Sequence, residues 1–180
     1  LQLLREAGIE THLVMSRSAE ITLAYESEFK LAKVCALADV THSQANIGAA
    51  ISSGSFRTLG MLVAPCSIRT MSEIATGVTS GLLSRAADVV LKERRRLVLM
   101  VRETPLHTGH LRTMTNLPER FARIAPPVPA FYARPRSIDE IVNHTVGRML
   151  DLFDIETGTV KRWGESVGPR PRHAATGPVT

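Results

Sequence analysis

The chain has 180 residues, enough for one ordinary domain with a substantial hydrophobic core, and its 44% apolar and 22% charged content is typical of globular proteins. Its apolar runs are too short to cross a membrane, and no secretory signal is visible. The formal net charge is +5, but aromatic residues make up only 4% of the chain, which argues against base stacking and so against a nucleic-acid partner.

Helices and strands are expected to alternate along most of the chain. The opening L-Q-L-L-R-E-A-G is typical of the last turns of a helix capped by Gly8. Further helices are expected over residues 16–25, 31–37, 67–76, 82–94, 107–120 and 137–153. Strands are expected over residues 10–15, 60–64, 97–101 and 123–125. This alternation predicts an α/β fold with a parallel sheet that is covered by helices on both faces.

The sequence also predicts how the chain begins and ends. The sequence starts inside a helix, so an upstream strand and its glycine-rich turn, usually the first of a doubly wound fold, are expected to be absent. A single domain is expected over residues 1–165. From residue 166 the composition is rich in Gly, Pro, Ala and Arg, which predicts a disordered tail.

The strand over residues 97–101 is wholly apolar and stops abruptly at Arg102 and Glu103. Ligands of open α/β sheets bind just beyond the carboxyl ends of such strands. Arginine binds phosphate bidentately, and a neighbouring carboxylate can orient it or move a proton. Arg85 and Lys92 lie two turns apart on nearly the same face of the preceding helix. Together they suggest a site for a phosphorylated anion, although a solvated ladder of ion pairs through Asp88 is the alternative.

The segment P-C-S-I-R-T (65–70) joins a buried strand to the start of a helix. Backbone N–H groups and the helix dipole favour an anion there, and Ser67 and Thr70 add hydroxyl groups. The alternative is a plain N-cap without a ligand. Cys66 is expected to be a buried core residue rather than a nucleophile, because no histidine lies near it in the sequence.

Repeated prolines in P-P-V-P-A-F-Y (126–132) fix an extended backbone that would aim Phe131 and Tyr132 rigidly. One ring could line the pocket of an apolar ligand while the tyrosine hydroxyl reaches a phosphate. The alternative is a polyproline recognition motif. No metal site is expected, because the pair His107 and His110 has no third ligand and the two cysteines lack metal-ligand spacing. A reducing, cytoplasmic setting is expected.

In combination, segments that span nearly the whole chain up to residue 165 resemble the UbiX-type flavin prenyltransferases and the closely similar partner proteins of aromatic-acid decarboxylases. The segments are T-H-L-V-M-S-R-S-A (11–19), S-S-G-S-F-R-T-L-G-M (52–61), P-C-S-I-R-T (65–70), G-L-L-S-R-A-A-D-V-V-L-K-E-R-R (81–95), L-V-L-M-V-R-E-T-P-L (97–106), P-P-V-P-A-F-Y (126–132) and R-W-G-E (162–165). The resemblance implies a three-layer, Rossmann-like (flavodoxin-like) fold that assembles as a homododecamer with active sites at subunit interfaces. It implies metal-independent transfer of a dimethylallyl group from dimethylallyl phosphate to N5 and C6 of reduced FMN. The prenylated FMN would then serve a UbiD-type decarboxylase.

The resemblance also implies roles for individual residues. The FMN-binding residues would be Ser16, Ser67, Ile68, Arg69, Thr70 and Arg102. The residues around the prenyl phosphate would be Arg85, Lys92, Arg102, Tyr132, Arg148 and Trp163. Catalytic roles would fall to Glu26, which would assist proton transfer, and to Lys92, Glu103, Tyr132 and Arg148. An allylic phosphate leaves more easily when cations and hydroxyl groups neutralise its growing charge, which makes this set chemically coherent.

Two departures from the family pattern stand out. The opening strand with its G-A-S-G-type turn is absent, and T-N-L-P-E-R-F-A-R-I (115–124) replaces a segment that is usually smaller and contains glycine. Pro118, Phe121 and Arg123 are expected to alter local packing or an oligomer contact. Two other functions stay open: a non-catalytic FMN-binding subunit of an aromatic-acid decarboxylase system, and a flavin-dependent decarboxylase that acts directly.

Overall fold

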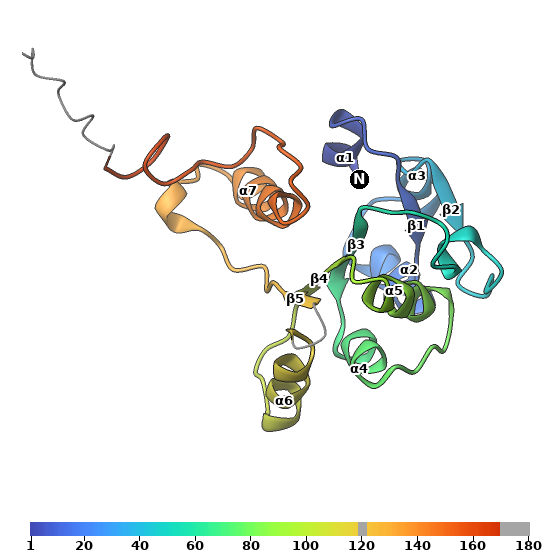
Figure 1. Ribbon diagram of the computed structural model, residues 1–180. Coiled ribbons are helices and arrows are strands. Elements are labelled where there is room, and N and C mark those ends of the chain that lie inside the picture. Colours follow the sequence, from blue (N-terminus) through green and yellow to red (C-terminus); the bar gives the residue numbers. More distant parts are fainter. Residues whose placement is uncertain (119–121, 170–180) are drawn as a thin grey trace, which may run out of the picture.

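The computed structural model describes residues 1–118 and 122–169 (Figure 1). The helices are α1 (Gln2–Glu6), α2 (Arg17–Glu26), α3 (Leu31–Cys35), α4 (Ile68–Thr76), α5 (Leu82–Lys92), α6 (Thr108–Asn116) and α7 (Ile138–Asp151), with short 3-10 turns η1 (Ala50–Ser52) and η3 (Phe131–Ala133). The strands are β1 (His12–Val14), β2 (Val40–His42), β3 (Gly60–Cys66), β4 (Arg96–Val101) and β5 (Ala122–Ile124).

All paired strands run parallel, as the alternation of helices and strands predicts. They form two sheets, one with the order β1-β2 and one with the order β3-β4-β5. No ladder joins the two sheets within the described residues. Parallel sheets with helices packed against them are flavodoxin-like, as expected.

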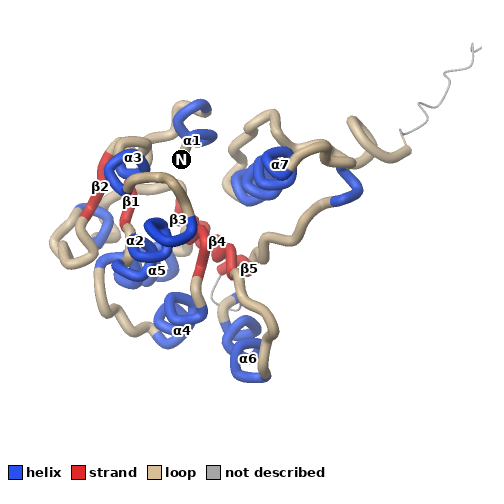
Figure 2. Tube along the Cα trace, turned by 180° about the vertical axis from the view of Figure 1, so that it is seen from behind, coloured by secondary structure: helices blue, strands red, loops and turns tan. Residues whose placement is uncertain are grey.

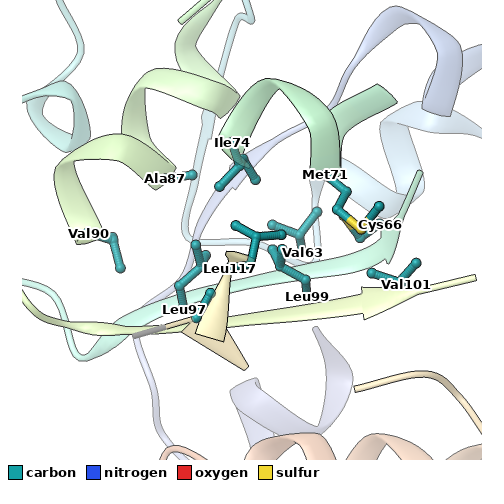
Figure 3. Close-up of a cluster of buried hydrophobic side chains, with 11 residues drawn as sticks. Val63, Cys66, Met71, Ile74, Ala87, Val90, Leu97, Leu99, Val101 and Leu117 are labelled. Carbon is teal, nitrogen blue, oxygen red and sulfur yellow. The ribbon is translucent and has the colours of Figure 1, made fainter. Parts of the chain in front are cut away.

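Strand β4 carries the core on both of its faces, because alternate side chains point to opposite sides of a strand. Leu97, Leu99 and Val101 pack with α4 and α5, whereas Val98 and Met100 pack with α7. Figure 3 shows the first of these clusters, with Met71 and Ile74 of α4 above the strand. The views in Figures 1 and 2 place α4 and α7 on opposite sides of β4. Fully burying each such side chain contributes roughly 1.5–3 kcal/mol.

The structure corrects several expected boundaries. Strand β3 continues through Pro65 to Cys66 instead of ending at Ala64, since its ladder resumes after an irregularity with Cys66 opposite Val101. Strand β2 was not expected, because V-T-H is short and partly exposed and so lacks a clear apolar pattern. Helix α6 ends at Asn116. Residues 119–121, which include the last two positions of the expected helix and Phe121, lie outside the described residues.

Apolar residues recur along α7, but the two halves of the helix differ in burial. Met149 and Leu150 are buried, but Ile138 is 77% exposed and Val142 is 50% exposed. The Ser-x-x-Glu start of α7 forms half of a capping box: Ser137 Oγ accepts from Glu140 N at 3.1 Å, whereas Glu140 Oε2 accepts from Arg136 N. The first half of α7 therefore presents apolar side chains that a single chain leaves uncovered.

Residues at the C-terminal end are partly ordered by a tight turn. Ser166 N and Val167 N both donate to the carbonyl oxygen of Arg162, and Gly164 N donates to the carbonyl oxygen of Val167. Residues 170–180, where most of the expected disordered tail falls, lie outside the described residues.

Cys66 is fully buried in the core, as expected, and burial raises the pKa of its thiol to about 12. Because the thiolate is the reactive form, we expect iodoacetamide at pH 8 to alkylate the less buried Cys35 at least about 100-fold faster than Cys66. Peptide mass spectrometry over a time course measures both rates. Unfolding in urea should make the two rates similar, and equal rates in the folded protein would contradict the buried assignment.

Candidate active site

Three candidate binding residues lie within two positions of the carboxyl ends of parallel strands. Ser67 directly follows β3 and Arg102 directly follows β4, whereas Ser16 is separated from the end of β1 by Met15. Ser16 Oγ accepts from Ala19 N at 3.1 Å, and Ser67 Oγ accepts from Thr70 N at 3.2 Å, so both serines are helix N-caps. We call the ends of β3 and β4, with Ser67–Thr70, Arg102 and Glu103, the carboxyl rim.

The start of α4 offers hydrogen-bond donors to an anion. The first-turn N–H groups of Ile68 and Arg69 have no intrahelical acceptor, and the helix dipole favours negative charge there. The side chain of Arg69 does not contribute in this chain, because its Nε donates to Glu73 Oε1 at 3.0 Å and the side chain is 77% exposed. Amide and hydroxyl donors of this kind fit the phosphate and carbonyl oxygens of FMN.

Arg102 is exposed at the rim and well placed for a ligand. Its backbone N–H donates to the carbonyl oxygen of Cys66 at 3.3 Å, which ties the end of β4 to the end of β3. Its guanidinium has no ion-pair partner within residues 1–118 and 122–169. Glu103 Oε1 accepts from Thr104 N at 3.0 Å, so its carboxylate is held close to the backbone of the same loop. An arginine and a carboxylate thus lie side by side at the rim.

Lys92 and Arg102 are not brought together within one chain. Lys92 is the last residue of α5, which precedes β4, whereas Arg102 follows β4. Six strand residues at about 3.3 Å each place the two ends of β4 roughly 20 Å apart. The ion-pair ladder expected on α5 is half present, because Arg85 Nη1 pairs with Asp88 Oδ2 at 2.9 Å but Lys92 Nζ pairs with Glu93.

Aromatic side chains from three segments meet beside α7. Tyr132 of η3 lies edge-on to Trp163, with ring centroids 6.0 Å apart, and edge-on to His144, at 5.8 Å. The family resemblance implies that Tyr132 and Trp163 line one pocket, and in this chain their rings are in contact. The sequence analysis did not single out His144, which is only 5% exposed. The signal that could have indicated it is a histidine among the residues that α7 buries.

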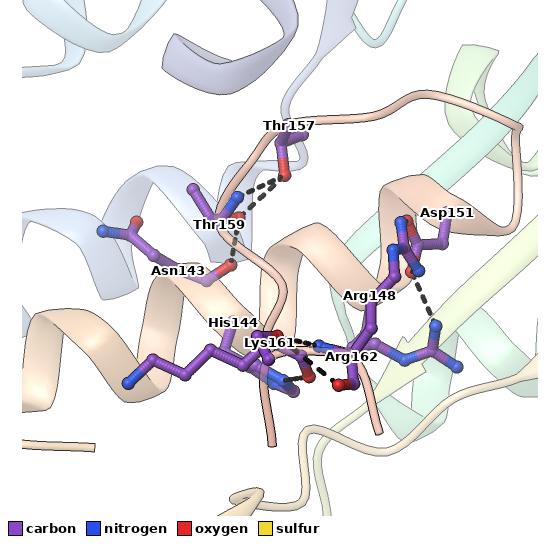
Figure 4. A network of polar contacts seen from close by, with 9 residues as sticks. Asn143, His144, Arg148, Asp151, Thr157, Thr159, Lys161 and Arg162 are labelled. Atoms are coloured by element: carbon purple, nitrogen blue, oxygen red, sulfur yellow. Dashed lines mark hydrogen bonds and ion pairs between the residues drawn. The ribbon is translucent and has the colours of Figure 1, made fainter. Parts of the chain in front are cut away.

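Arg148 of α7 belongs to a cluster that the sequence analysis did not find. Its Nη1 donates to Asp151 Oδ2 at 2.6 Å, and Arg162 donates to both oxygens of Asp151 at 3.0 and 3.1 Å (Figure 4). Burial opposes ionisation of Asp151, but the hydrogen bonds from Arg162 and Arg148 outweigh it and hold the pKa of the carboxyl below its usual value. A single carboxylate therefore organises two cations.

Glu26 ends α2 and is exposed. Helix α2 buries none of its residues, and no described contact joins Glu26 to another candidate residue. A cavity of about 170 Å³ lies between η3 and α7, lined in part by Ala133, His144 and Lys161. It is smaller than the roughly 300–1,000 Å³ of typical cofactor sites and lies away from the carboxyl rim. At the carboxyl rim, Ser67, Arg102 and Glu103 are exposed in a single chain.

Gly147 allows the segment before Trp163 to cross α7 closely. A methyl group at this position would lie 2.5 Å from Thr159 Oγ1 and 2.7 Å from Val160 Cγ2. Alanine favours a helix by about 1 kcal/mol over glycine, but overpacking of short branched side chains costs more. We expect Gly147→Ala to lower the free energy of unfolding in urea by about 1–3 kcal/mol. The exposed Asn143→Ala should change it by less than about 0.5 kcal/mol, and stabilisation by Gly147→Ala would contradict the close crossing.

Residues 1–118 and 122–169 contain no group of three or more His, Cys, Asp or Glu side chains arranged to hold a metal ion. No helix in the same part of the chain is long and apolar enough to cross a membrane.

The fold is that of a flavodoxin-like α/β protein, with helix-start N–H groups and an exposed arginine just beyond the carboxyl ends of its parallel strands. The Flavoprotein family model matches residues 1–161. The chain is 63% identical over 156 residues to flavin prenyltransferase UbiX of Escherichia coli (strain K12), which covers 86% of this chain and 82% of the relative. The chain therefore belongs to the Flavoprotein family and, within it, to the UbiX-type flavin prenyltransferases that its motifs resemble.

Solved structures are similar over most of the chain. The crystal structure of AnUbiX in complex with FMN and dimethylallyl pyrophosphate has a TM-score of 0.88 and 52% identity, covering 90% of this chain and 86% of that one. A dodecameric FMN-dependent UbiX-like decarboxylase from Escherichia coli O157:H7 has a TM-score of 0.87 and 50% identity, covering 90% of this chain and 88% of that one. These similarities confirm the expected fold.

Proposed function

We propose that this chain is a flavin prenyltransferase that transfers a dimethylallyl group from dimethylallyl phosphate to N5 and C6 of reduced FMN. The observation that carries the proposal is the carboxyl rim, where Ser67–Thr70 and the unpaired Arg102 lie next to Glu103, in a chain similar to a UbiX solved with FMN and a dimethylallyl donor. The proposal includes a single FMN-binding domain over residues 1–165.

Bound reduced FMN supplies the nucleophilic ring atoms, and the protein supplies positioning and charge. Ser16, the hydroxyl groups of Ser67 and Thr70, and the first-turn amides of α4 hold the flavin. Arg102 neutralises negative charge beside it, and Glu103 moves a proton at the rim. Arg69 would act through its backbone N–H, because its side chain pairs with Glu73.

The prenyl phosphate would lie among cations and aromatic rings. Arg85, Lys92, Arg102 and Arg148 neutralise the charge that grows on the leaving phosphate. Tyr132 donates its hydroxyl to a phosphate oxygen, and its ring with that of Trp163 excludes water from the allylic carbon. Glu26 would assist proton transfer from the end of α2.

We place this site between subunits of a homo-oligomer, in line with a dodecameric relative. Two observations support the placement: Lys92 and Arg102 lie at opposite ends of β4, and the apolar side chains of Ile138, Val142 and Trp163 are exposed in one chain. The proposed partner for the product is a UbiD-type decarboxylase that takes up prenylated FMN in the cytoplasm.

The test loads the purified protein with FMN, reduces it anaerobically and adds dimethylallyl phosphate. The expected result is a flavin heavier by one dimethylallyl group in mass spectrometry, with a changed absorbance spectrum. Geranyl phosphate and omission of the donor are the controls. An intact, FMN-loaded protein that leaves reduced flavin unalkylated would contradict the proposal and favour a non-catalytic FMN-binding subunit.

One similarity favours a second candidate function. A relative of known structure is named a UbiX-like decarboxylase, which suggests direct loss of a carboxyl group from an aromatic acid. The same preparation, given phenylacrylic acid without a partner enzyme, would release carbon dioxide if this function were correct. We expect no release.

A further inference from the structure

Asp151 lies between two arginine side chains, Arg148 on α7 and Arg162 beside it. Its side chain is only 13% exposed, and its two oxygens accept three hydrogen bonds from Arg148 and Arg162. The contacts from Arg162 are bidentate, with Nη1 on one carboxylate oxygen and Nη2 on the other. A bidentate pair fixes the plane and direction of the guanidinium as well as its distance.

Arg162 is the residue before Trp163, so the same pair anchors the turn that carries the indole. The turn is closed by donation from Arg162 N to Ser166 Oγ at 2.8 Å and by the bridge between Trp163 and Val167. The indole lies against the backbone of Gly168, where a methyl group would be 2.7 Å from the ring. Trp163 nevertheless is 64% exposed, so few packing contacts hold it.

We propose that Asp151 is a positioning residue for prenyl transfer, whose carboxylate fixes Arg148 directly and holds Trp163 beside Tyr132 through Arg162. This inference deepens the proposed function and rests on it for the roles of Arg148 and Trp163 at the prenyl donor. Removal of the negative charge leaves two guanidinium groups close together, and their repulsion drives them apart. The side of the pocket made by α7 then loses its geometry while the carboxyl rim stays intact.

The ion cluster differs from an ordinary surface pair. Exposed pairs contribute little, because long side chains lose freedom and water screens the charges. Asp151 is instead shielded from water and shared by two arginines, Arg148 on the same helix and Arg162 eleven positions further along the chain than Asp151. Such a contact determines where Arg148 and Trp163 point.

The kinetic test compares the wild type with Asp151→Asn, Asp151→Glu and a matched control, Asp139→Asn, which changes an exposed carboxylate in the first turn of α7. Asparagine has a single acceptor oxygen, so it cannot receive both arginines in the same way. We expect Asp151→Asn to raise KM for dimethylallyl phosphate about 10-fold and to change kcat by less than about threefold. Asp151→Glu should recover part of the affinity, and the control should match the wild type.

A second readout needs no substrate. Trp163 is the only tryptophan of the chain, so its fluorescence anisotropy reports how tightly the indole is held. Asp151→Asn should lower the anisotropy, Asp151→Glu should restore it, and Asp139→Asn should leave it unchanged, with far-UV circular dichroism confirming that each variant is folded. Unchanged anisotropy in Asp151→Asn overturns the inference, as does an unchanged KM in an active enzyme. A wild type without prenyl transfer would instead overturn the proposed function, while the anisotropy still decides the positioning of Trp163.

Discussion

Arg102→Ala is expected to lower kcat/KM for prenyl transfer by about 100- to 1,000-fold, the range seen when a preorganised group that stabilises developing charge is removed. Arg102 follows the buried strand β4 at the carboxyl rim, and its guanidinium has no ion-pair partner among the described residues. It is therefore available to the anionic ligand and needs no rearrangement of an existing pair. Single-turnover assays with reduced FMN and dimethylallyl phosphate measure the loss.

The control for this variant is Arg112→Ala, which removes an exposed arginine from α6. It should leave kcat/KM unchanged within about twofold, because isolated surface charges contribute little. Arg102→Ala should remain folded, since the hydrogen bond that ties β4 to β3 at this point comes from its backbone N–H. If kcat/KM of Arg102→Ala stays within about threefold of the wild type, the assignment of Arg102 to the site is wrong.

The positions of candidate residues that the sequence predicted are those set by local order along the chain. Ser67 caps α4 and Arg102 follows β4 because a strand end and a helix start determine the place of the residue between them. The burial of Cys66 was predicted from its residue type and from the lack of a nearby histidine in the sequence, although β3 extends further toward it than expected. Helix boundaries were less accurate, as α6 shows by ending at Asn116.

The parts that the sequence did not predict depend on contacts between distant segments. Asp151 meets Arg162 only because the chain crosses back over α7 at Gly147, and nothing in the local pattern indicates that crossing. The apolar pattern of α7 was present, but it could not tell which half a single chain buries. Lys92 is close to the rim motifs in sequence, yet the strand between it and Arg102 carries it to the other end of the sheet.

That separation gives a prediction about assembly. Chains with Lys92→Ala and chains with Arg102→Ala should each be nearly inactive alone, but oligomers that contain both should recover activity. If Lys92 of one subunit and Arg102 of another serve the same site, random mixing of equal amounts leaves about a quarter of the sites with both residues intact. Co-expression with two different affinity tags and tandem purification yields the mixed oligomers, whose rate is compared with that of the wild type.

A reciprocal mixture separates this arrangement from a site within one chain. When wild-type chains are mixed equally with chains that carry both Lys92→Ala and Arg102→Ala, about a quarter of the sites are intact if two subunits contribute, but about half if one chain supplies both residues. The single-variant mixture should then show activity, and the two mixtures should have similar rates. No recovery in the first mixture, with a half-maximal rate in the second, would place both residues of a site in one chain. The roughly 20 Å along β4 makes that outcome hard to reconcile with a compact phosphate-binding site.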